Sequence, residues 1–311
     1  MKRLFSSLYF IFFVLLLAIA PAFSQNSSAS EIQEGFRLLQ SENFAAAVGA
    51  FSNILHADSE NFQARLGLAI ALIGVDKLPE ASREIAKLLA RSPNDTKLLD
   101  MAAQTFWQQK RFAETEKVLK RRLALGDERA ELWALYGDAL DAQKKTAEAI
   151  PAYEKAVALK PDSITLRYAL GALLWKAIRY DEAEQVFLEI LRRQPNEPRA
   201  SFNLGDIYLT NGDAAKAIPF LETAAKSFPD EFDTRLALGK AYLGAKQIEK
   251  AIAELEIAVK LNDKIAEGFY HLGLALQRGG RKEEAKKAMS KTQELKKQKL
   301  ASESLELRKP H

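Results

Sequence analysis

The sequence repeats with a constant period of about 34 residues, eight times in succession, from Ser28 to about Lys299 without an insertion. Three positions of the repeat show this best. The first is small: Gly35, Ala69, Ala103, Gly137, Gly171, Gly205, Gly239 and Gly273. The second, twelve positions later, is also small: Ala47, Ala81, Thr115, Ala149, Ala183, Ala217, Ala251 and Ala285. The third, four positions further on, is large and apolar: Phe51, Ile85, Leu119, Tyr153, Phe187, Leu221, Leu255 and Met289. Such a fixed period predicts a stacked repeat array.

Each repeat predicts two amphipathic helices. In the repeat Ile164–Glu197, apolar residues recur at three- and four-residue intervals in both halves, with a turn around 176–180. Pro195 follows the second half and ends its helix, because proline has no backbone N–H to continue the hydrogen bonding. Glycine or alanine on the facing surfaces allows the two helices to approach closely, and the large apolar residue fills the space beside them.

The fourth repeat resembles the tetratricopeptide (TPR) pattern, through Trp133, Gly137, Leu140, Ala149, Tyr153, Ala156 and Pro161. The resemblance extends over nearly all of the chain after residue 27, although Thr115 replaces an alanine and Glu31 replaces an aromatic residue. It implies an all-α fold, an α-solenoid forming a right-handed superhelix of about eight helix-turn-helix units. The first helix of each repeat would line its inner groove.

The N-terminus predicts export. Lys2 and Arg3 precede an apolar run from Leu8 to Ala20, and small residues follow, so residues 1–24 fit a signal peptide cleaved before Gln25. The alternative is an uncleaved anchor, for which the run is short. We therefore expect a periplasmic or secreted protein. The chain has no cysteine, which excludes disulfides, most structural zinc sites and a lipoprotein.

The remaining organisation follows from composition. Residues 25–30 predict a polar linker, residues 31–299 the TPR array (in register from residue 28), and residues 300–311 a charged C-terminal tail. The formal net charge of +4, or +2 after loss of Lys2 and Arg3, is too balanced to predict nucleic-acid binding. Arg281–His311 carries ten Lys/Arg against five Glu. We interpret this segment as a capping helix with a solvated face, and contact with anionic lipid is the alternative.

Nothing in the sequence predicts catalysis. His56, His271 and His311 occupy unrelated repeat positions, and no hydrolase, zinc-protease or phosphate-loop motif occurs. We therefore expect no catalytic residues, no metal site and no cofactor, and interpret the chain as a non-enzymatic surface for holding other molecules.

The groove is the predicted partner-binding site. The TPR resemblance implies that positions two, five, nine, twelve and thirteen of each repeat face it. Position five gives Tyr168, Phe202 and Tyr270, position nine gives Asp138 and Asp206, and position twelve gives Trp107 and Trp175, with Asp100 and Asp141 close by. Aromatic anchors beside carboxylates suit a protein or peptide with basic or aromatic segments. The alternative is that the tryptophans pack against neighbouring repeats.

Some cytosolic TPR proteins clamp a carboxylate with basic and asparagine residues. These residues are missing from the present pattern.

Taken together, these features predict an exported scaffold or adaptor that binds a protein or peptide in its concave groove. The alternative is a scaffold for exopolysaccharide synthesis or export, in which the aromatic rings would contact sugars.

Overall fold

The computed structural model describes residues 27–126 and 128–306, and the predicted signal peptide, residues 1–24, lies outside them. The chain divides into two compact units, residues 1–127 and 128–311, each of which is described by itself. The repeat register of the sequence continues unchanged from one unit to the other. The described residues form helices and turns, without strands.

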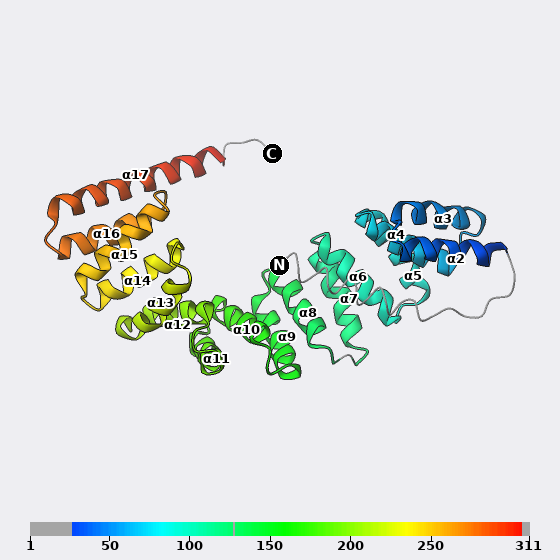
Figure 1. Ribbon diagram of the computed structural model, residues 1–311, viewed down its shortest axis with the longest axis horizontal. Helices are drawn as coiled ribbons and strands as arrows, with labels where there is room; N and C mark the ends of the chain where they lie inside the picture. Colours follow the sequence, from blue (N-terminus) through cyan, green and yellow to red (C-terminus); the bar gives the residue numbers. More distant parts are fainter. Residues whose placement is uncertain (1–26, 127, 307–311) are drawn as a thin grey trace. The chain divides into compact units, whose positions relative to one another are not determined.

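The N-terminal unit contains six helices within its described residues, arranged as three antiparallel pairs (Figure 1). These are α2 (Ser27–Gln40), α3 (Phe44–Ala57), α4 (Phe62–Gly74), α5 (Leu78–Arg91), α6 (Thr96–Gln108) and α7 (Phe112–Leu123). Each pair is one sequence repeat, as the period predicts.

The C-terminal unit contains the other five pairs among the residues that the structure describes. They are α8 (Ala130–Ala142), α9 (Thr146–Leu159), α10 (Ile164–Lys176), α11 (Tyr180–Arg193), α12 (Pro198–Thr210), α13 (Ala214–Ser227), α14 (Phe232–Gly244), α15 (Ile248–Leu261), α16 (Ala266–Arg278) and α17 (Lys282–Glu306). From α4 onward the first helices begin exactly one sequence period apart, and so do all the second helices from α3 onward. The predicted α-solenoid of eight helical repeats is therefore confirmed.

The contact between the two helices of a repeat rests on the predicted small and large columns. A Cβ atom added to Gly171 would lie 2.8 Å from the ring of Phe187, and one added to Gly205 would lie 2.5 Å from Leu221. The same conflict, at 2.5–2.9 Å, arises at Gly35, Gly137, Gly239 and Gly273. Because Phe187 and Leu221 are fully buried, the glycines are required for this close approach.

The turn between the two helices is the same in every repeat. One residue adopts a positive φ, at the same position each time: Glu42, Asp76, Lys110, Lys144, Ile178, Gly212, Lys246 and Gly280. Its N–H and the next N–H donate to carbonyls of the last helical turn, as in Ile178 N–H to Trp175 O (3.0 Å) and Arg179 N–H to Leu174 O (2.9 Å). This is the Schellman ending, for which glycine is the favoured residue. Ile178, β-branched and 72% exposed, adopts it under strain.

The two ends of the array are polar where internal repeats are apolar. In α15, Ile248, Ile252 and Val259 lie on the side that meets α16. One repeat later the same positions are Lys282, Lys286 and Gln293, all exposed. These exposed residues match the polar end surface expected of a capping helix.

The first helix shows the corresponding change at its outer side. The positions that hold Leu68 and Ala71 in α4, both buried, hold Glu34 and Arg37 in α2. These two exposed side chains form an ion pair at 2.6 Å. The face that would receive a preceding second helix is therefore hydrophilic.

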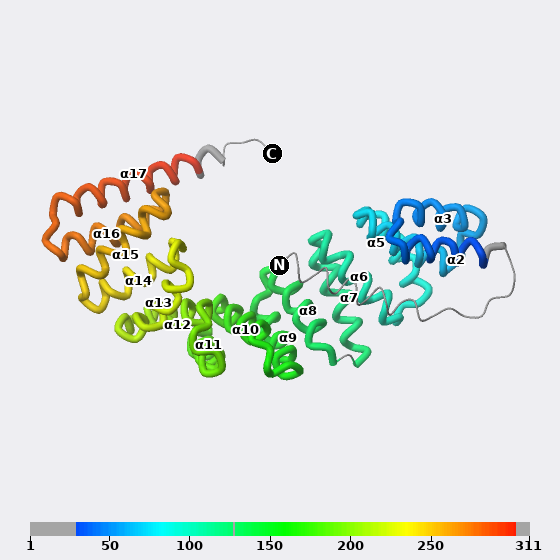
Figure 2. Tube along the Cα trace, in the orientation of Figure 1, coloured from blue at the N-terminus to red at the C-terminus, as the bar shows by residue number. Residues whose placement is uncertain are grey.

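The segment boundaries predicted at both ends differ from the structure. Helix α2 begins at Ser27, so most of the predicted linker 25–30 is helical, because Ile32 and Leu39 are already buried against the first repeat. Helix α17 continues to Glu306 and includes much of the predicted tail 300–311, which makes it longer than the other second helices (Figure 2). None of the described helices is long and apolar enough to cross a membrane.

The helix contact predicts opposite effects for the same substitution at two glycines. Gly171→Ala should destabilise its repeat by about 1–3 kcal/mol, because the new methyl group overlaps Phe187. Gly49→Ala should stabilise its repeat by about 1 kcal/mol, because Gly49 lies inside α3 with no atom within 4 Å of the added Cβ. Hydrogen exchange of the α10–α11 and α3 amides measures each effect locally. Slower exchange in α10–α11 of Gly171→Ala would contradict the steric argument.

Candidate functional site

First helices of the C-terminal unit lie next to one another. Helix α10 contacts α12, α12 contacts α14, and α14 contacts α16, whereas no described second helix contacts the next second helix to a comparable extent. The side chains along this first-helix face therefore come from several repeats. This face includes positions nine, twelve and thirteen, where the sequence predicts a groove.

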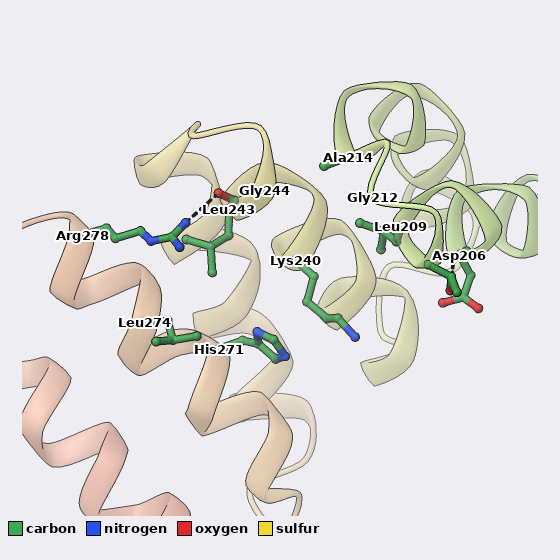
Figure 3. A pocket seen from close by; sticks show the side chains of 11 residues that line it. Asp206, Leu209, Gly212, Ala214, Lys240, Leu243, Gly244, His271, Leu274 and Arg278 are labelled. Carbon is green, nitrogen blue, oxygen red and sulfur yellow. Dashed lines mark hydrogen bonds between the residues drawn. The ribbon is translucent and has the colours of Figure 1, made fainter.

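An open groove of about 400 Å³ lies on this face, between α12, α14 and α16 (Figure 3). The side chains that determine its chemistry are Asp206, Leu209, Lys240, Leu243, His271, Leu274 and Arg278. Small residues allow close helix packing at its turn end. A Cβ atom on Gly244 would lie 2.7 Å from the Cβ of Ala214, so the start of α13 packs closely on the end of α14 there.

Trp175 is not one of the residues that line this groove, but a hydrogen bond holds it against one of them. Its indole Nε1–H on α10 donates to Oδ2 of Asp206 on α12, at 3.1 Å. The ring is 37% exposed, whereas the preceding Leu174 is only 3% exposed and belongs to the core. Trp175 therefore offers an aromatic surface in a fixed orientation, at little further cost in side-chain entropy when a partner binds.

Burial raises the pKa of the Asp206 carboxyl above its usual value. The hydrogen bond from Trp175 and the charge of Lys240 oppose this rise, and the charge of Glu267 adds to it. Lys240 Nζ lies 3.0 Å from Glu267 Oε1 in an ion pair at the surface. Asp206 itself has no cationic group within ion-pair distance among the described residues, so its charge is only partly compensated.

His271 and Arg278, both on α16, complete the polar part of the groove. His271 Nε2 lies 3.7 Å from Glu267 Oε1. Burial and the charge of Lys240 lower the pKa of His271 although Glu267 raises it, so the ring is neutral at pH 7. Arg278 donates from Nη1 to the carbonyl of Leu243 at 3.2 Å. Within the described part of the chain, it has no carboxylate partner.

The other predicted residues of the C-terminal unit divide into structural and exposed groups. Tyr168 and Phe202 are half-buried against the core, and the Tyr168 hydroxyl accepts a hydrogen bond from Asn203 Nδ2 at 3.0 Å. Asp138 accepts a hydrogen bond from the Tyr153 hydroxyl at 2.5 Å. Burial raises the pKa of Asp138, and this hydrogen bond lowers it.

Tyr270 is 41% exposed, and the ammonium of Lys296 on α17 lies 5.8 Å from its ring centre. The structure thus brings Trp175 and Asp206 into direct contact at the groove. Tyr168, Phe202 and Asp138 instead have partners in the fold. Tyr270 remains exposed, although it does not line the groove of Figure 3.

Trp107 belongs to the N-terminal unit and is half-buried there. Its ring lies 5.2 Å from that of Phe112 on α7, which fits the alternative interpretation of a packing residue. Asp100, placed near the groove by its repeat position, is almost fully buried and forms an ion pair with Arg122 at 2.8 Å. That interpretation of Asp100 was wrong, because a basic residue on α7 neutralises it inside the helix pair.

Sequence reasoning missed the apolar part of the groove and Arg278, and gave His271 no role in the groove. The signal was present, since Leu209 and Leu243 occupy the same repeat position as Trp175, and Arg278 occupies that of Lys176.

Comparison with known families agrees with this architecture. Models of the tetratricopeptide repeat match residues 38–105, 137–177, 168–232, 208–268 and 267–295. The chain belongs to the tetratricopeptide-repeat family. Proteins of this family are built as helical repeat scaffolds, in which stacked repeats form extended binding surfaces.

Curated relatives of this TPR protein are much longer than the segments they share with it. DnaJ homolog subfamily C member 3 of Homo sapiens is 26% identical over 146 residues, 42% of this chain and 29% of its own length. Anaphase-promoting complex subunit 3 of Schizosaccharomyces pombe is 22% identical over 203 residues, 65% of this chain and 30% of its own. Cellulose synthase operon protein C of Xanthomonas axonopodis pv. citri is 25% identical over 270 residues, 79% of this chain and 17% of its own. The chain thus spans less than a third of these relatives.

Solved structures share the fold. MamA of Desulfovibrio magneticus RS-1, solved from residue 41 to its end, is 26% identical with a TM-score of 0.52. The match covers 56% of this chain and 97% of that solved chain. YrrB, described as a TPR protein with an unusual peptide-binding site, is 22% identical with a TM-score of 0.52, over 60% of this chain and 95% of YrrB. A TPR protein from Parabacteroides merdae is 17% identical with a TM-score of 0.51, over 86% of this chain and 99% of its own.

The geometry predicts that the Trp175 indole N–H reports the titration of Asp206. Its NMR signal should shift with a midpoint above 3.8, the usual pKa of aspartate, because the pKa of Asp206 is raised. Because the folded-state pKa of Asp206 is raised, its ionisation destabilises the fold. This cost is full above the folded-state pKa and disappears only as the pH falls to the unfolded-state pKa, near 3.8. Asp206→Asn should abolish the shift, and Trp175→Phe identifies the signal. A midpoint at or below 3.8 would contradict the burial of this carboxyl.

Proposed function

We propose that this TPR protein is an exported, non-catalytic scaffold that binds a protein or peptide segment in the first-helix groove of its C-terminal unit. The contact that carries the proposal is the hydrogen bond from Trp175 to Asp206, which holds an exposed aromatic ring at the edge of an open groove. Rigid aromatic residues beside a fixed charge are typical anchors of protein interfaces.

The relatives support a binding role in general terms. YrrB is described by a peptide-binding site, and another relative is a subunit of a multiprotein complex. The groove of this chain offers Leu209, Leu243 and Leu274 for apolar contact, and charges of both signs for orientation. Lys240 is paired with Glu267, whereas Asp206 and Arg278 have only neutral hydrogen-bond partners among the described residues, so these two charges are available to orient a bound segment.

Trp175→Ala should weaken capture of the partner roughly thirtyfold, or about 2 kcal/mol, because the ring is an anchor of the interface. The measurement compares partner yield between wild-type and variant baits in extracts of the native envelope, with mass spectrometry of what is retained. Leu261→Ala is the matched control, because Leu261 is similarly exposed (38%) but lies at the end of a second helix.

Stability separates binding from packing. Trp175→Ala should leave hydrogen exchange of α10 close to wild type, since the ring is partly exposed and Leu174 fills the core. Unfolding of α10 in this variant, or unchanged partner yield, would show that Trp175 is not an anchor.

Export is proposed from the sequence of residues 1–24. If they are a signal peptide, intact-mass measurement of the native protein should give a chain that begins near Gln25, in the periplasm or the medium. Recovery of the full-length chain from the membrane would instead identify an uncleaved anchor.

A second candidate is a scaffold for polysaccharide synthesis or export. The similarity over 270 residues to cellulose synthase operon protein C, together with exposed Trp175 and Tyr270, favours it. Aromatic rings can stack on the apolar faces of sugars as well as on peptide side chains. Binding to a glycan array, lost in Trp175→Ala, distinguishes this function from protein binding.

A further inference from the structure

Two charges in the groove lack a partner of opposite sign, and they lie at its two ends. Nearby charged groups are paired within the fold: Lys240 with Glu267 at 3.0 Å and Lys176 with Asp141 at 2.7 Å. Asp206 accepts only the neutral indole N–H of Trp175, and Arg278 donates only to the Leu243 carbonyl, as far as the described residues show. Asp206 is partly buried and Arg278 is exposed. Within the described chain, each charge lacks a counter-charge and is available for an ion pair with a ligand.

The distance between these two charges fits a short extended segment. Asp206 lies on α12 and Arg278 on α16, at opposite ends of the groove, and Lys240 and His271 lie between them (Figure 3). Packed helices are about 8–10 Å apart, so two steps across the array give roughly 20 Å. An extended chain spans this distance with about six residues.

The groove also offers apolar side chains along its length. Leu209, Leu243 and Leu274 line it, one from each of α12, α14 and α16. Lys240 is paired with Glu267, and burial lowers the pKa of His271, which favours its neutral form. An occupant therefore meets a negative end, a centre that combines leucine side chains with the paired Lys240 and with His271, and a positive end.

We infer that the groove binds a short extended peptide segment of this length, with a basic side chain at Asp206, apolar side chains between, and a carboxylate at Arg278. This inference rests on the proposed function and adds the charge pattern and single orientation of the occupant. An acidic side chain or a free C-terminus supplies the same carboxylate, and the experiment separates the two. The opposite charges at the two ends exclude the reversed orientation of the peptide. A reversed peptide would place its basic side chain at Arg278 and its carboxylate at Asp206, where like charges repel.

The test is selection of phage-displayed random dodecapeptides on the full chain. One library carries a free peptide C-terminus and the other a blocked one. Wild type should enrich peptides with Lys or Arg and, about five positions away, Asp or Glu, separated by apolar residues. Enrichment of a terminal apolar run without Asp or Glu, in the free-terminus library only, identifies the chain end as the carboxylate.

Variants then assign each charge. Asp206→Asn should weaken the best peptide at least tenfold, and should have no further effect once the basic residue of that peptide is replaced by Gln. Arg278→Gln should behave in the same way toward the carboxylate. Lys226→Gln, an exposed charge at the end of α13, is the control and should leave affinity unchanged. The double variant Asp206→Lys, Arg278→Glu should select peptides of the opposite polarity.

The outcomes distinguish this inference from the proposed function. Peptides that need Trp175 but are insensitive to Asp206→Asn and Arg278→Gln would overturn the charge pattern and leave groove binding intact. Failure of both libraries to enrich any peptide that depends on Trp175 would overturn both proposals for peptides.

Discussion

The whole array depends on how closely the two helices of each repeat approach. A glycine on the first helix faces a large apolar side chain sixteen positions later, and six of the eight repeats use this pair. The close contact sets the angle and separation of the two helices. The same geometry recurs at every repeat, and for this reason the first helices of neighbouring repeats meet and leave a surface between them. The groove is thus a product of steric fit inside the repeats rather than of residues chosen at the surface.

Most of the fold could be predicted from sequence because its determinants are periodic. Proline after the second helix, as at Pro161 and Pro195, and the small residues at Gly171 and Ala183 indicated the helix pairs and their register. The turn between the two helices was harder to predict from the sequence. Six of its eight left-handed positions hold a residue other than glycine, including Ile178, so the usual glycine signal is absent there. These turns form because two backbone hydrogen bonds per turn and the packing of both helices outweigh the local strain.

The candidate site could be predicted only in part. A repeat position indicates which way a side chain points, but not which neighbouring group pairs with its charge. Asp100 and Asp138 share an acidic character with Asp206, yet Arg122 and the Tyr153 hydroxyl engage the first two. These partners lie on other helices, at spacings that periodicity does not report. For Trp175, the repeat position predicted that the ring is exposed. It did not predict the hydrogen bond to Asp206 of the next repeat. Local pairing therefore separates candidate binding residues from structural ones.

The polar ends of the array have a consequence for how such a chain changes length. Glu34 and Arg37 at one end, and Lys282, Lys286 and Gln293 at the other, prevent another apolar helix from stacking there. Internal repeats have no such restriction, and their boundaries recur at a constant interval. Unequal recombination between internal repeats can therefore add or remove whole helix pairs without exposing a new apolar end. Each such event would lengthen or shorten the row of first helices by one step, so the length of the first-helix face could evolve while both polar ends stay the same.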